Sequence, residues 1–178
     1  MFWRYVVIAV AGYLLGNISM GIIISGRYHM DIREHGSGNA GTTNVLRTLG
    51  WLPSALTLVG DALKSFAASM LGQWLAGAPG LLLGGFMAVV GHNWPVFNGF
   101  RGGKGMAASL VTSVAFPIVM AILYRDSPDV WMYVIYAVLL AAVTIFSHRA
   151  NIQRLMRGTE NRINFKKIKV KPDEKTKG

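Results

Sequence analysis

The stretch YVVIAVAGYLLGNISMGIIIS, residues 5–25, contains no Asp, Glu, Lys or Arg. A helix needs about 20 mainly apolar residues to cross the hydrocarbon core of a bilayer, so this stretch predicts a membrane-spanning helix near residues 3–25. A cleaved signal peptide is disfavoured, because the run is too long for a signal core and small polar residues interrupt it.

Three further stretches lack these charged residues: Ser65–Phe100, Gly105–Tyr124 and Val130–Ser147. The first is long enough for one helix to end, turn and continue as another, and we expect the turn at Gly77–Gly80, because Gly and Pro interrupt helices. The alternating ten-residue segments of a membrane barrel do not appear. We predict an all-α fold, a polytopic transmembrane helix bundle with about five spans. The spans are expected near residues 3–25, 51–76, 80–98, 106–124 and 130–147.

Composition agrees with a membrane protein. Of the 178 residues, 52% are hydrophobic and only 15% are charged, whereas about 25% are charged in an average soluble domain. The chain contains no Cys, which excludes disulfides, thiol catalysis and Cys-ligated metal sites. The sequence also lacks a carboxylate cluster for a di-metal site, so we expect neither a metal nor another cofactor.

The basic residues predict the orientation. If the N-terminus is outside, 15 of the 18 Lys and Arg residues lie inside, ten of them after His148. The positive-inside rule therefore places the N-terminus outside and the C-terminus inside. The net charge of +10 is then mainly a topology signal, and no nucleic-acid partner is expected. We divide the chain into a transmembrane domain, 1–161, and a basic cytoplasmic tail, 162–178, suited to anionic lipid or to a solvated disordered end.

The first of three polar segments on the inside face is HGSGNAGTTNVLR, residues 35–47. It matches the G-x-G-x-x-G pattern, but an apolar helix precedes it where a dinucleotide site needs a strand. Its small residues allow backbone N–H groups to converge on an anion. Thr43 or Asn44 can cap a following helix, and Arg47 can hold a phosphate through two hydrogen bonds. The alternative is a flexible Gly-rich loop with a helix cap.

The second segment is GHNWPVF, residues 91–97, followed by GFRGGKG, residues 99–105. Three glycines around Lys104 offer exposed amides beside a cation. Gly105 follows Lys104, so this is not a Walker A loop, which needs Ser or Thr there. His92 lies near the end of a span and is either a site residue or an interfacial histidine bonded to backbone.

The third segment begins at His148, and helical spacing places His148, Asn151 and Leu155 on one side of a helix. An amphipathic helix at the membrane surface is the alternative, which leaves His148 and Asn151 unexplained. Within the second span, Asp61 and Lys64 are three residues apart and can neutralise each other. Ionisable residues in a span are functional candidates, although a structural ion pair is the competing interpretation.

Glycine-rich anion sites, several cations and two histidines are thus predicted on one membrane face. A substrate that combines phosphate groups with a lipid part fits this set best, because charge-assisted hydrogen bonds would hold each phosphate.

These segments resemble a known family. SGNAGTTN at 37–44, GHNWPVF at 91–97 with GGKG at 102–105, and the HxxNIxRLxxGxE pattern at 148–160 are similar to the three signature segments of the bacterial acyl-phosphate:glycerol-3-phosphate acyltransferases. The DALK stretch at 61–64 resembles that family's Asp-x-x-Lys. The resemblance runs in order from about Gly12 to Ile163.

The resemblance implies a multi-pass enzyme of the bacterial inner membrane, with its active-site motifs on the cytoplasmic face among membrane lipids. Such an enzyme moves a fatty acyl group from acyl phosphate to the 1-hydroxyl of glycerol 3-phosphate. The products are 1-acylglycerol 3-phosphate (lysophosphatidic acid) and phosphate, in the first step of phospholipid synthesis. Protein partners are left open.

The resemblance also implies roles for individual residues, with Glu160 structural. The implied catalytic residues are Ser37, Lys104, His148 and Asn151. The implied substrate-binding residues are Gly38, Asn39, Gly41, Thr43, Asn44, Arg47, Lys64, His92, Gly102, Gly103 and Gly105. The acceptor hydroxyl can lose its proton to His148, to His92 or to the donor's own phosphate, and we favour the phosphate because no histidine has an evident carboxylate partner.

One departure stands out. Family members usually have more hydrophobic sequence after the GGKG segment, whereas here Ser109-Leu110-Val111 follows almost at once. Two crossings are expected to be missing, which leaves His148 on the inside face and puts the completeness of the substrate groove in question.

Three other functions compete. A small anion or lipid-phosphate transporter would use the same phosphate-binding segments, although no internal repeat is visible. A phosphatidyl-alcohol transferase would need several intramembrane Asp residues, and only Asp61 lies in a span. A structural membrane subunit would leave the three polar segments unexplained.

Overall fold

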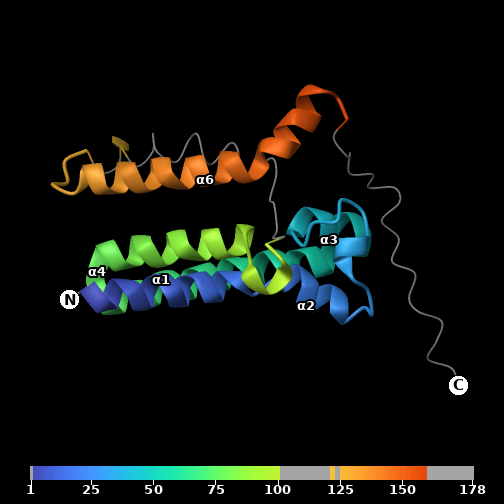
Figure 1. The fold of residues 1–178 in the computed structure, drawn as a ribbon, viewed down its shortest axis with the longest axis horizontal. Coiled ribbons are helices and arrows are strands. Elements are labelled where there is room, and N and C mark those ends of the chain that lie inside the picture. Colours follow the sequence, from blue (N-terminus) through green and yellow to red (C-terminus); the bar gives the residue numbers. More distant parts are fainter. Residues whose placement is uncertain (1, 101–120, 123–124, 160–178) are drawn as a thin grey trace, which may run out of the picture.

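The computed structural model describes residues 2–100, 121–122 and 125–159, and these form an assembly of helices (Figure 1). No strand occurs in this part of the chain, which agrees with the predicted all-α fold. The elements in chain order are α1 (Phe2–Asn17), α2 (Met20–Gly26), the 3-10 helix η1 (Ile32–Glu34), α3 (Thr42–Leu49), α4 (Trp51–Asn93), the 3-10 helix η2 (Val96–Asn98) and α6 (Val130–Met156).

The first apolar stretch is helical but not continuous. α1 ends at Asn17, Ser19 is extended, and α2 begins at Met20. The span expected near residues 3–25 is present as Phe2–Gly26, divided by this break into two helices. At this interruption the carbonyls of Gly16 and Ile18 accept hydrogen bonds from the Lys64 ammonium.

α4 consists of two helices that fold back on each other. Its backbone leaves the helical region at Ala76 and Gly77, and Gly77 has a φ of 65°. Beyond this point the chain reverses, so that Gly80 lies against Gly72 and Gly84 against Ala68. The turn predicted at Gly77–Gly80 is confirmed, because the left-handed backbone region that reverses the chain strongly favours glycine.

α1 lies beside both halves of α4 (Figure 1). Gly12 faces Gly84 and Gly16 faces Ala88, so closely that a Cβ at Gly16 would overlap the backbone of Ala88. Small residues permit this approach, which supplies the van der Waals contact that holds membrane helices together. We call α1 and the two halves of α4, residues 2–17 and 51–93, the α1–α4 unit.

α6 runs along one side of this unit (Figure 1), and its Tyr136 hydroxyl lies near Gly85 of α4. It meets the end of α4 through the rings of Phe146 and Trp94, whose centroids are 6.0 Å apart. The helix continues beyond the predicted end of the span at residue 147 as far as Met156. The third polar segment is therefore a continuation of the spanning helix.

Three segments of the described chain are long and apolar enough to cross a membrane: Phe2–Gly26, Trp51–Asn98 and Val130–Ala150. The second contains both halves of α4. The predicted span at 106–124 lies almost entirely outside the described residues, as does the tail at 162–178.

Candidate functional site

Asn44 organises the first polar segment. Its side chain is only 2% exposed. Its amide nitrogen donates to the carbonyls of Ile32 and His35, at 3.1 and 2.9 Å, and its Oδ1 accepts the backbone N–H of Ser37 at 2.8 Å. A buried amide that satisfies three backbone groups holds the loop before α3 in one conformation.

The start of α3 differs from the expected cap. Neither Thr43 nor Asn44 caps the helix, because Gly41 occupies the N-cap position and no side chain there accepts a hydrogen bond. Asn44 turns back toward the preceding loop instead of toward its own helix. The prediction of a Thr43 or Asn44 cap is therefore wrong, since the loop carbonyls and the Ser37 N–H compete for that amide.

The backbone N–H groups available to an anion lie at residues 39–43. The N–H of Ser37 is bonded to Asn44, and that of Gly38 to the carbonyl of His35 at 3.0 Å. No partner for the amides of residues 39–43 occurs in the described part of the chain. Free amides at the start of a helix favour an anion. Here they belong to Asn39, Ala40, Gly41, Thr42 and Thr43.

Two predicted side chains flank these amides. Ser37 is half-buried, and its Oγ accepts from the Asn39 side chain at 3.4 Å. Arg47 is half-buried one turn into α3 and donates to Asn44 Oδ1 at 3.4 Å. Gly36 and Gly38 both have positive φ, at 62° and 70°, a conformation that glycine adopts without strain.

A neighbouring arginine is already engaged. Arg33 forms a two-pronged pair with Asp31, with nitrogen–oxygen distances of 2.9 and 2.7 Å. The Arg33 guanidinium, followed by the Arg33 backbone N–H, lowers the pKa of the Asp31 carboxyl to about 2. This exposed pair lies outside the membrane-spanning segments.

Lys64 is buried inside the α1–α4 unit, with 7% of its surface exposed. Its ammonium lies 2.9 Å from Asp61 Oδ1, which confirms the predicted ion pair. It also donates to the carbonyls of Gly16 and Ile18, at the end of α1. A cation at the C-terminal end of a helix is stabilised by the helix dipole as well as by its carboxylate.

His92 joins this cluster from the last turn of α4. Its Nδ1 lies 3.0 Å from the Lys64 ammonium and 3.7 Å from Asp61 Oδ1. Two residues later, the Trp94 carbonyl accepts a 2.8 Å hydrogen bond from the Tyr13 hydroxyl. The end of α4 is therefore tied to the first half of α4 through His92 and to α1 through Tyr13.

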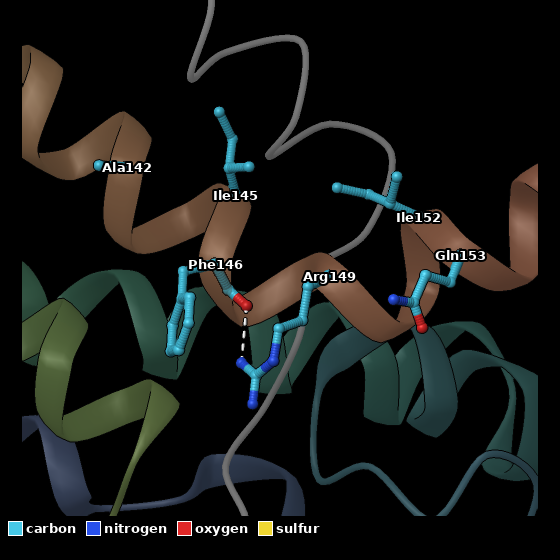
Figure 2. Close-up of a pocket in the computed structure, with 6 residues that line it drawn as sticks. All are labelled: Ala142, Ile145, Phe146, Arg149, Ile152 and Gln153. Atoms are coloured by element: carbon cyan, nitrogen blue, oxygen red, sulfur yellow. Dashed lines mark hydrogen bonds between the residues drawn. The ribbon is translucent and has the colours of Figure 1, made fainter.

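His148 is buried on α6, at 3% exposure. It comes two residues after Phe146, the residue that contacts Trp94 at the end of α4. Arg149 lies over the Phe146 ring, 4.1 Å from its centroid, and donates to the Phe146 carbonyl. An open, largely apolar groove of about 540 Å³ lies on this part of α6, and Figure 2 shows the residues that line it. Its lining residues are Ala142, Ile145, Phe146, Arg149, Ile152 and Gln153.

Several predicted site residues are not covered by the structure. Lys104, with Gly102, Gly103 and Gly105, lies outside the described residues, and so does Glu160. Asn151 belongs to α6, but its side chain is likewise outside the description. Within the part that is described, no group of three or more His, Asp or Glu side chains is arranged to hold a metal ion.

Sequence reasoning missed two residues that shape this region. Tyr13 holds the Trp94 carbonyl, and Asn17 is buried at the end of α1, where its amide nitrogen donates to the Tyr13 carbonyl at 2.7 Å. A tyrosine and an asparagine in an apolar span are a usable signal, because a polar group in a membrane needs a partner.

The described polar groups gather at one end of the molecule. α2, α3 and the end of α4 lie together at the end away from the N-terminus, and the C-terminal part of α6 extends toward the same end (Figure 1). Lys64 and His92 are in direct contact, and Ser37, Asn44 and Arg47 lie within one loop-and-helix segment.

A family model and several known proteins match this chain. Residues 6–125 and 106–158 match the family model described as glycerol-3-phosphate acyltransferase. The chain is 43% identical to the glycerol-3-phosphate acyltransferase of Clostridioides difficile (strain 630), over 93% of this chain and 98% of that protein. It is 39% identical to the corresponding protein of Alkaliphilus metalliredigens (strain QYMF), over 89% and 96% of the two chains.

Two crystal structures of PlsY (YgiH), an integral membrane glycerol 3-phosphate acyltransferase, are also similar to this chain. The glycerol 3-phosphate form superposes with a TM-score of 0.70 at 28% identity, over 92% of this chain and 98% of that one. The lysophosphatidic acid form gives 0.71 at the same identity, over 92% and 97%.

The comparison also bears on the predicted missing segment. The alignment with the Clostridioides protein runs over 200 residues, more than the 178 of this chain, so that protein has residues that this chain lacks. The two segments matched to the family overlap at residues 106–125. This is the region where family members are expected to have additional hydrophobic sequence.

Proposed function

Because this chain belongs to the glycerol-3-phosphate acyltransferase family, we propose that it moves a fatty acyl group from acyl phosphate to the 1-hydroxyl of glycerol 3-phosphate. It is an integral membrane acyltransferase of phospholipid synthesis that produces lysophosphatidic acid. The acyl-phosphate donor, the site of acylation and the residue roles are the proposed part.

The observation that carries the proposal is the meeting of the described polar segments at one end of the helix assembly. Both substrates carry phosphate, and the free amides of residues 39–43 with Arg47 form a suitable anion site. In this proposal, Ser37 and Arg47 contact phosphate directly. Asn44 acts by holding the loop, because its amide is already bonded to backbone groups.

The remaining site residues are assigned on the family resemblance. Lys104 and its neighbouring glycines would bind the second phosphate, and His148 with Asn151 would line the same centre. The groove beside Phe146 and Arg149 (Figure 2) has the apolar character that an alkyl chain requires.

The proposed reaction needs mainly positioning. The acceptor oxygen forms an ester bond with the acyl carbon, the bond between that carbon and the phosphate oxygen breaks, and the hydroxyl proton ends on the released phosphate. Acyl phosphate is a mixed anhydride with a good leaving group, so charge stabilisation and orientation can supply most of the rate. We expect the donor phosphate to accept the proton.

The proposed topology has five spans in this chain, an outside N-terminus and an inside C-terminus. The broken α4 supplies two of the spans, and the basic residues supply the orientation. The site would then face the cytoplasm at the bacterial inner membrane, where soluble glycerol 3-phosphate can enter.

The direct test is release of phosphate and formation of lysophosphatidic acid from palmitoyl phosphate and glycerol 3-phosphate by the purified protein in detergent. Omission of either substrate is the control. A folded preparation that releases no phosphate would contradict the proposed donor and favour a small anion or lipid-phosphate transporter.

A matched pair of arginine variants tests the phosphate site. We expect Arg47→Met to raise the KM for glycerol 3-phosphate by about 100-fold or more, because a charge-assisted contact is lost. Arg33→Met should change this KM by less than about threefold, since Arg33 is paired with Asp31. Equal effects of the two variants would contradict the assignment of Arg47.

His148→Ala tests the proton acceptor. With the donor phosphate as acceptor, turnover at saturating substrate stays near normal. A loss of about 10²–10⁴ in kcat with unchanged KM would instead identify His148 as the general base.

A further inference from the structure

The ammonium of Lys64 has no donor left for a substrate. An ammonium has three N–H bonds and no acceptor. Around Lys64 lie three hydrogen-bond acceptors at 3.0 Å or less, namely the carbonyls of Gly16 and Ile18 and His92 Nδ1. Asp61 Oδ1 lies 2.9 Å away as the partner of an ion pair, without hydrogen-bond geometry. A lysine saturated in this way organises its neighbours and has no N–H to offer a phosphate.

The same contact selects the form of the His92 ring. Because Lys64 can only donate, His92 Nδ1 must accept, and the neutral ring then carries its proton on Nε2. Asp61 does not change this assignment of the ring proton. Its Oδ1 lies 3.7 Å from His92 Nδ1, which is beyond hydrogen-bond distance. The same oxygen lies 2.9 Å from the Lys64 ammonium.

The second ring nitrogen of His92 is available. Within the described part of the chain, Nε2 has no hydrogen-bond partner, and 24% of the side chain is exposed. His92 belongs to the last turn of α4, at the end of the molecule where α3 and the α1–α2 junction lie (Figure 1). The adjoining Trp94 carbonyl is fixed by Tyr13, so the ring sits on a backbone that is held in place.

We propose that His92 donates a hydrogen bond from Nε2 to a phosphoryl oxygen of a substrate, and that Lys64 is a positioning residue that keeps the ring in this donor form. The inference rests on the proposed function, because it requires phosphorylated substrates at this end of the bundle. It gives His92 the role of a neutral donor that fixes a charged oxygen, and it leaves the hydroxyl proton to another acceptor.

Two amide substitutions separate the two ring nitrogens. In His92→Gln, the amide can reach the position of Nε2 and replace the donor. In His92→Asn, the shorter amide can take the place of Nδ1 and keep the contact with Lys64, but nothing occupies the position of Nε2. We expect His92→Asn to lower kcat/KM by about 10²–10³, the usual effect of removing one preorganised donor, and His92→Gln to remain within about tenfold of the unsubstituted protein.

The opposite pattern, an active His92→Asn and an inactive His92→Gln, would show that His92 serves only to hold Lys64. Two inactive but folded variants would point to a general base, which no amide can replace. Two active variants would show that the Nε2 donor is unnecessary. Each of these results overturns the proposal. Separate KM values for palmitoyl phosphate and glycerol 3-phosphate show which substrate supplies the oxygen.

A spectroscopic measurement tests the ring form without relying on activity. In protein labelled with ¹⁵N-histidine, with the His92 signals assigned by their loss in His92→Gln, we expect Nδ1 unprotonated and Nε2 protonated at neutral pH. Lys64→Met should lose this preference and give a mixture of forms. A protonated Nδ1 in the unsubstituted protein would overturn the inference.

The two proposals fail in distinguishable ways. If the unsubstituted protein makes no lysophosphatidic acid from palmitoyl phosphate, the proposed function fails. If it is active and the His92 variants or the nitrogen signals differ from expectation, only the inference about His92 and Lys64 fails.

Discussion

α1 and α6 are both apolar enough to cross a membrane, yet they are used differently. In the span that contains α1, 28% of the apolar window is buried in the structure, against 11% for α6. α1 contains Gly12 and Gly16, which allow close contact with α4, whereas α6 contains no glycine. Equal hydropathy thus leads to different packing, because small residues determine how closely two membrane helices approach.

The largest effect is expected from filling the contact between α1 and α4. Gly16→Leu should destabilise the fold by more than about 3 kcal/mol, because its Cβ already overlaps the Ala88 backbone and the helices must separate. Ala142→Leu on the exposed face of α6 is the matched control and should have little effect. Thermal unfolding in detergent measures both. Similar unfolding midpoints for the two variants would show that α1 is no more closely packed than α6.

The next effect concerns charge inside the α1–α4 unit. Asp61→Asn should cost about 3 kcal/mol, since it leaves the buried Lys64 ammonium without its carboxylate. The double variant Asp61→Asn with Lys64→Met should recover part of this loss, because it removes the uncompensated charge. Unfolding measurements on the two single variants and the double variant give the coupling. Additive effects would contradict a direct pair.

A smaller effect is expected where the two regions touch. Phe146→Leu removes the ring that contacts Trp94 and lies beneath Arg149. We expect a loss of about 1 kcal/mol, which is typical of an aromatic pair. Leu139→Ala, an exposed position on α6, provides the comparison. If it costs more than Phe146→Leu, the contact with α4 is not what holds α6.

The smallest effect should come from the exposed pair Asp31–Arg33, which shows what an ion pair contributes without membrane packing. The pKa of Asp31 is lowered in the folded state to about 2, so its stabilising contribution is present above the ordinary value near 3.8 and is lost as the pH falls toward 2. Solvent and salt weaken such a pair. Asp31→Asn should therefore shift the unfolding midpoint slightly at pH 6 and still less near pH 2.

The local parts of the structure could be read from the sequence. The apolar stretches, the glycine turn near Gly77 and the Asp61–Lys64 pair each depend on residues that are close together in the chain. The same holds for the three signature segments, whose order and spacing are typical of the family.

What only the tertiary structure decided is which partner each polar group has. Asn44 was expected to cap a helix or bind a phosphate, but it is bonded to loop backbone. Lys64 was expected to pair with Asp61 or to bind substrate, but its ammonium also holds the end of α1 and His92. The sequence determined where apolar helices form, because that depends on local composition. Long-range hydrogen bonds depend on how those helices are placed, and a polar group inside a membrane takes whichever partner that placement brings within reach.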